Sequence, residues 1–143
     1  MWTLALILSI IHFSYHQLIS NFDLYPFNNI RSYTPPQKFM EVGLHAIIIG
    51  FTIVVLYFRK QSLTGIAVGG LGMLVIAEFM SWWRYYFFGP GKQQKNRDEK
   101  IDKHTIQILP PIKYHPKPNL ELCILHVTTL FCFVVTFWLW VKV

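Results

Sequence analysis

Histidines and a glutamate stand within apolar stretches of the sequence, where residues of these types can carry acid–base or metal chemistry. His12 and His16 are four residues apart in "IIHFSYHQLIS", so on a helix both lie on one face. His45, Glu78 and His126 occupy three further apolar stretches. Ionisable groups in a membrane cost about 2.5–3.5 kcal/mol each on insertion scales and nearly always face a protein interior or water. These five residues are therefore the first candidates for a functional site.

The composition predicts that the chain is embedded in lipid. Of its 143 residues, 53% are hydrophobic and 14% are charged, whereas a soluble domain carries about 25% charged residues. At about 1.5 Å per residue, a run of roughly 20 apolar residues crosses the hydrocarbon layer of about 30 Å. We expect a single transmembrane domain over residues 1–143, with four spans at 2–20, 36–58, 63–88 and 119–141.

The connections between these runs predict an all-α, antiparallel bundle of four transmembrane helices. "FRKQS" is long enough only for a tight turn, so the second and third helices form a hairpin. Thr34 and Pro35 form a start signal for the second helix, and Asn119 caps the fourth. The connection 89–118 is a long polar, proline-rich loop, and its segment "LPPIKYHPKP" is expected to cover the mouth of the bundle.

Basic residues are distributed unequally between the two sides of this predicted bundle. The side with the termini and the tight turn has only Arg59, Lys60 and Lys142, and the other ten lysines and arginines lie on the loop side. The positive-inside rule then places both termini outside a plasma (inner) membrane and the long loop in the cytoplasm. Because the net charge of +6 lies next to the spans, it indicates the lipid bilayer as partner and no nucleic acid.

The five candidate residues are predicted to lie at similar depths in one leaflet. Counted inward from each apolar edge on the loop side, His45, Glu78 and His126 lie about 10 Å below the interface at about 1.5 Å per residue. His16 is slightly shallower, and His12 is one turn deeper. All four helices thus contribute to one layer, whereas the opposite leaflet is almost purely apolar.

Imidazoles and a carboxylate together match the ligand set of a divalent transition metal such as zinc, iron or manganese. The sequence-based hypothesis is a metal site in which Glu78 is either a ligand or the general base for a metal-bound water. Haem is less favoured, because the carboxylates do not suit its apolar pocket. Whether the chain is an enzyme stays open. The predicted metal ligands are His12, His16, His45, Glu78 and His126.

Two other classes of function use the same residues. In a proton- or ion-coupled transporter or channel, Glu78 and the histidines would form a relay. In a non-catalytic interaction, immunity or assembly subunit, the polar layer would only hold the helices together by hydrogen bonds. The sequence has no serine nucleophile motif, phosphate loop, Cys-x2-Cys pair or dinucleotide-binding glycine pattern.

Small residues form a stripe on the third predicted helix. Gly65, Gly69 and Gly72 in "GIAVGGLG" share one face, which permits close helix contact. Such contact serves either packing within the hairpin of helices two and three or a homodimer.

The charge asymmetry predicts the topology, and cysteine labelling tests it. In one variant a cysteine replaces Gln61 in the tight turn, and in another it replaces Gln93 in the long loop. A membrane-impermeant thiol reagent should label the Gln61→Cys variant only from outside and the Gln93→Cys variant only from the cytoplasmic face. Labelling of both positions from the same face contradicts four crossings.

Overall fold

The computed structural model of the chain describes residues 1–30, 35–89 and 105–142, and its secondary structure over these ranges is entirely helical. The expectation of four helices long and apolar enough to cross a membrane is confirmed. They are Trp2–Asn21, Lys38–Tyr57, Gln61–Phe88 and Leu120–Lys142.

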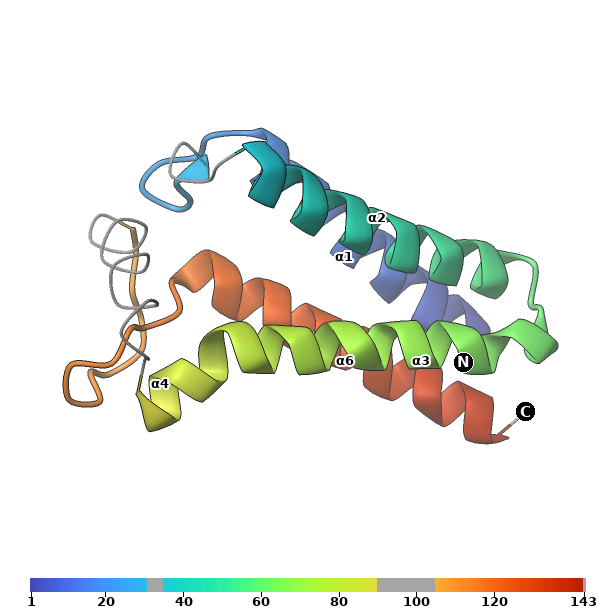
Figure 1. Cartoon of the computed structure of the whole chain (residues 1–143). Coiled ribbons are helices and arrows are strands. Elements are labelled where there is room, and N and C mark those ends of the chain that lie inside the picture. Colours follow the sequence, from blue (N-terminus) through green and yellow to red (C-terminus); the bar gives the residue numbers. More distant parts are fainter. Residues whose placement is uncertain (31–34, 90–104, 143) are drawn as a thin grey trace.

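The bounds of the helices follow the apolar runs to within two residues of the expected spans. Figure 1 shows α1, α2, α3, α4 and α6. A π-helical segment, η2, joins α3 to α4 without a break. The bounds are α1 Trp2–Asn21, α2 Pro35–Tyr57, α3 Gln61–Glu78, η2 Phe79–Trp83, α4 Arg84–Phe88 and α6 Leu120–Lys142.

Local residue chemistry explains where these helices begin and end. Pro35 is the first residue of α2, as predicted, whereas the expected cap Thr34 lies outside the described residues. Asn119 caps α6, because its Oδ1 accepts a hydrogen bond from the Leu122 backbone N–H at 2.9 Å. Gly89 ends α4 with a φ of 92°, a left-handed conformation that glycine adopts without strain.

The four long helices pack around a common interior. Helix α1 contacts α2 and α6, and α3 contacts the same two helices. Figure 1 shows both chain termini at the end that carries the α2–α3 turn, which we call the termini end. The segments 22–30 and 105–119 lie at the opposite end, which we call the loop end.

Apolar side chains both fill the interior and cover the outside. Ile49, Leu71, Leu74 and Cys132 form a buried cluster, and Ala5, Leu56 and Leu139 form a second one. On the outside, large apolar side chains on every long helix are exposed, among them Ile11, Ile47, Met73 and Phe131. An exterior of this kind suits a hydrocarbon environment better than water.

The predicted glycine stripe is used partly for contacts within the chain. A Cβ atom at Gly65 would lie 3.2 Å from Trp140 Nε1, and one at Gly72 would lie 3.3 Å from Phe133 Cε2. Both of these aromatic rings belong to α6, so the two glycines let α3 and α6 approach closely. Only Gly69 of the three has open space beside it. The homodimer stays a prediction.

The proline-rich segment lies against the loop end of the bundle. The Tyr86 hydroxyl donates to the Pro110 carbonyl at 2.9 Å, and His115 Nδ1 donates to the Tyr86 carbonyl at 2.8 Å. The Ile106 N–H donates to the Pro26 carbonyl at 3.1 Å. These contacts tie residues 105–119 to α4 and to the loop that follows α1.

Candidate functional site

The five candidate residues lie in the half of the bundle nearer the loop end and come from all four long helices. His12 and His16 are on α1, His45 is on α2, Glu78 is the last residue of α3, and His126 is on α6. The side chains of His12, His16, Glu78 and His126 are buried, and that of His45 is 14% exposed. Their positions relative to Glu78 determine which of them act together.

Glu78 is the centre of a polar network that joins the four helices. Its Oε1 atom accepts a hydrogen bond from the Thr129 hydroxyl at 2.7 Å and lies 3.5 Å from His45 Nε2. The Thr129 oxygen is in turn 3.4 Å from His12 Nε2. We call these four residues, His12, Thr129, Glu78 and His45, the Glu78 network.

The proton positions on His12 follow from its partners. The Thr128 oxygen lies 2.8 Å from the Leu125 carbonyl and 2.8 Å from His12 Nδ1, and when its one hydroxyl proton goes to the carbonyl, it accepts from His12 Nδ1. A neutral His12 therefore has its lone pair on Nε2, the atom that faces Thr129. A second proton on His12 would be donated to the Thr129 oxygen.

The hydrogen bond made by His45 Nδ1 decides which atom of its ring faces Glu78. His45 Nδ1 lies 3.0 Å from the Glu41 backbone carbonyl, which can only accept, so Nδ1 is the donor. A neutral His45 then directs the lone pair of Nε2 at the carboxylate oxygen Oε1 of Glu78. Two acceptors facing each other are stable only if one of them is protonated or a cation lies between them.

His16 contacts the network through its ring and has an unused polar atom. Its imidazole stacks on that of His45, with the ring centroids 4.4 Å apart and the planes inclined by 12°. His16 Nδ1 is buried and has no hydrogen-bond partner in the part of the chain that the structure describes. A buried polar atom of this kind costs free energy unless water or a ligand satisfies it.

His126 lies beside the network and has a different partner. The indole Nε1 of Trp83 donates to His126 Nδ1 at 3.0 Å. Because an indole N–H can only donate, Nδ1 of His126 is the acceptor, and a neutral His126 has its proton on Nε2.

The ring positions fit a shared metal ion less well than the sequence indicated. Within residues 1–30, 35–89 and 105–142, no three His, Cys, Asp or Glu side chains are arranged to hold a metal. The lone pairs of imidazole lie in the ring plane, so the stacked rings of His16 and His45 cannot both point at one ion about 2.0–2.1 Å away. The Nδ1 lone pair of His126 is occupied by Trp83.

The π-helical segment η2 positions the two tryptophans next to the site. It starts directly after Glu78 and covers Phe79–Trp83, so the chain makes one wide turn there. Trp82 is buried and lines a pocket, and Trp83 reaches His126. Single π-helical turns occur frequently at functional sites.

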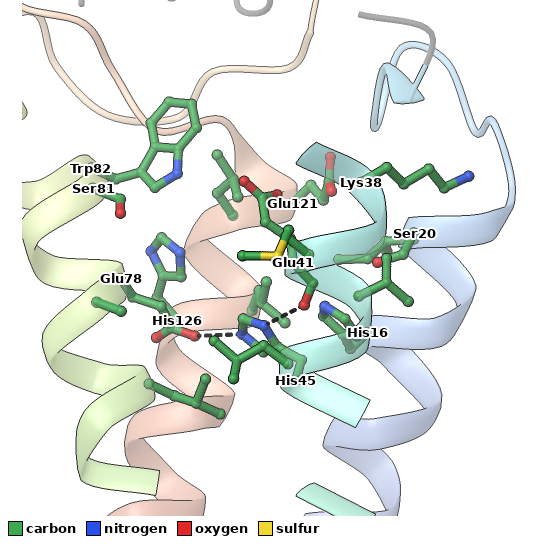
Figure 2. Close-up of a pocket in the computed structure, with 18 of the residues that line it drawn as sticks. His16, Ser20, Lys38, Glu41, His45, Glu78, Ser81, Trp82, Glu121 and His126 are labelled. Carbon is green, nitrogen blue, oxygen red and sulfur yellow. Dashed lines mark hydrogen bonds and ion pairs between the residues drawn. The ribbon is translucent and has the colours of Figure 1, made fainter. Parts of the chain in front are cut away.

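A pocket of about 300 Å³ opens beside the Glu78 network toward the loop end. Figure 2 shows His45 and Glu78 at its floor, with Trp82 and Ser81 on one side and Ser20 and Lys38 on the other. His16 and His126 also line it. Of the described residues, none in 105–119 lines the pocket, so the segment expected to cover the mouth instead lies against α4 and the first loop.

Several site residues were not found from the sequence. Thr129 is three residues after His126 and therefore on the same helix face, but the sequence does not indicate that its hydroxyl joins His12 to Glu78. Trp83 belongs to an aromatic run that is typical of a membrane interface, and in the structure it also holds His126 by a hydrogen bond. The only signal in the sequence was the Thr128–Thr129 pair one turn after His126 in an otherwise apolar helix.

Comparison of this chain with protein-family models, with curated proteins and with solved structures gave no match. The functional proposal therefore depends on the geometry of the Glu78 network and of the pocket.

Proposed function

We propose that the chain is a multi-pass protein of a plasma (inner) membrane, an antiparallel four-helix bundle that performs proton-coupled transport. The Glu78 network carries the proton, and the pocket at the loop end holds the transported species. Four membrane-length helices and their exposed apolar side chains support insertion into lipid.

One observation carries this proposal: His45 Nε2 and Glu78 Oε1 face each other at 3.5 Å while His45 Nδ1 is committed to a carbonyl. A proton on either the carboxyl group or the imidazole would turn this contact into a hydrogen bond. Because the pair lines an open pocket, this proton can be exchanged with whatever enters there.

Thr129 connects this pair to the deeper histidine. A hydroxyl group can accept a proton on one side and give up its own on the other. A proton on His12 Nε2 would pass to the Thr129 oxygen, and the Thr129 proton would pass to Glu78. Each transfer breaks one bond to hydrogen and forms another, so charge moves while the heavy atoms stay in place.

Buried hydroxyl groups continue from the network toward the termini end. Ser9 is on the same α1 face as His12, and Thr136 lies about two turns beyond Thr129 on α6; both are fully buried. Thr136 Oγ1 has no hydrogen-bond partner among the described residues. A buried, unsatisfied hydroxyl group favours an internal water, which would extend the proton path.

A divalent transition metal between His45 and Glu78 is the second proposal. The 3.5 Å between Nε2 and Oε1 suits two ligands of one ion at about 2.0–2.2 Å each. His12 or His16 would have to turn to complete the ligand set, so the geometry favours the relay.

Elemental analysis separates the two proposals. If the relay is correct, the purified protein contains less than one equivalent of zinc, iron or manganese after growth in metal-supplemented medium. The His45→Ala variant then has the same metal content as the unmodified chain. One equivalent of metal that is lost in His45→Ala would support the metal site instead.

The relay predicts that proton movement depends on the hydroxyl group of Thr129. In vesicles containing the full chain, a potassium diffusion potential should drive proton uptake, reported by a pH-sensitive dye. Thr129→Val keeps the side-chain shape but removes the hydroxyl group, so uptake should fall roughly tenfold to a hundredfold. Thr129→Ser restores the hydroxyl group and should restore most of the rate.

Two further variants complete this experiment. Glu78→Gln should abolish uptake, because an amide cannot hold the exchanging proton. Asp23→Asn removes a carboxylate that is outside the pocket and should leave the rate unchanged. Equal uptake by Thr129→Val and the unmodified chain would contradict the relay.

A further inference from the structure

Part of the pocket lining is exposed on the side that would face lipid. Met40 and Leu44 of α2 line it and are 72% and 51% exposed, and Ala77 and Ser81 line it from α3 and η2. Exposed lining residues on both α2 and α3 would let a ligand approach the polar floor from between these two helices. This arrangement suits a molecule with an apolar body and one polar end.

The pocket lining and the whole chain differ in their balance of acidic residues to lysines and arginines. The protein carries 13 lysines and arginines and only seven acidic residues. Yet the described residues that line the pocket include Glu41, Glu78 and Glu121, whereas Lys38 is the one lysine or arginine among them. Figure 2 shows the Lys38 side chain extending away from the pocket, with its nitrogen outermost. The pocket thus favours a positively charged group.

Two side chains indicate what kind of cation fits. The buried Nδ1 atom of His16 has no partner among the described residues, and it can accept a hydrogen bond from an N–H group of a ligand. The indole side chain of Trp82 lines the same pocket, and aromatic rings of this kind attract cations. An ammonium group with at least one N–H can satisfy both, whereas an anion cannot.

We propose that the pocket binds a lipophilic organic ammonium ion, which enters between α2 and α3 and displaces the proton shared by Glu78 and His45. This inference rests on the proposed proton relay and names the species that the relay exchanges for protons. The ammonium N–H groups bind the Glu78 carboxylate and His16 Nδ1. One proton leaves to water at the loop end for each ammonium bound, and no covalent bond of the ligand changes.

Calorimetric titration of the full chain in detergent tests the charge preference. The probes are 4-phenylbutylammonium, its neutral analogue 4-phenylbutanol and the quaternary 4-phenylbutyltrimethylammonium. The primary ammonium should bind about tenfold or more tightly than the alcohol, because hydrogen bonds to charged groups are stronger than those between neutral groups. The quaternary ion lacks an N–H for His16 and should bind more weakly than the primary one.

Titration in two buffers with different ionisation enthalpies measures the proton released. The unmodified chain should release up to one proton per 4-phenylbutylammonium near neutral pH. Glu78→Gln should release none and bind about tenfold more weakly. His16→Phe keeps a stacked ring but loses the acceptor, so it should weaken the primary ammonium and leave the quaternary ion unaffected. The matched control Asp23→Asn should behave like the unmodified chain.

The outcomes separate this inference from the proton relay. Equal binding of the alcohol and the primary ammonium overturns the inference, and proton uptake that still requires Thr129 then keeps the relay. Ammonium binding without proton release overturns the exchange. If proton uptake does not depend on the Thr129 hydroxyl but ammonium still binds, the relay is overturned and the pocket only binds cations.

Discussion

The 3.5 Å contact between His45 Nε2 and Glu78 Oε1 is the interaction on which the rest of the site depends. Both atoms are acceptors as long as His45 donates through Nδ1 to the Glu41 carbonyl, so the contact requires a proton or another cation. In a bundle interior surrounded by apolar side chains, an unpaired charge at this position would be costly. The pair is thus the place where we propose that a proton is held and exchanged.

Residues of three other parts of the fold hold Glu78 and His45 in position or line the pocket beside them. Thr129 on α6 holds the carboxylate oxygen from one side, and the His16 ring on α1 fixes the plane of His45 from the other. The wide turn of η2 begins at Glu78 and brings Trp82 to the pocket. Because the polar atoms come from four different helices, they are in register only when α1, α2, α3 and α6 are packed together.

Much of the fold could be predicted from the sequence, and less of the site. A helix in lipid forms all hydrogen bonds of its backbone N–H and C=O groups within itself, so apolar runs of sufficient length predict membrane-spanning helices. Pro35 and Asn119 mark helix starts by known capping rules. Counting residues predicted that His45, Glu78 and His126 lie at one depth. The rotation of each helix was not predictable, because it depends on packing such as Gly65 against Trp140, and rotation decides which ring nitrogen meets which oxygen.

Nuclear magnetic resonance of the full chain in lipid, with ¹⁵N-histidine and ¹³C-carboxyl glutamate, tests the shared proton most directly. His45→Gln and Glu78→Gln variants assign the signals of the pair. In the empty protein near neutral pH, we predict either an imidazolium His45 beside an ionised Glu78 or a neutral His45 beside a protonated Glu78. A spectrum with a neutral His45 and an ionised Glu78 in the same metal-free molecule would contradict the account.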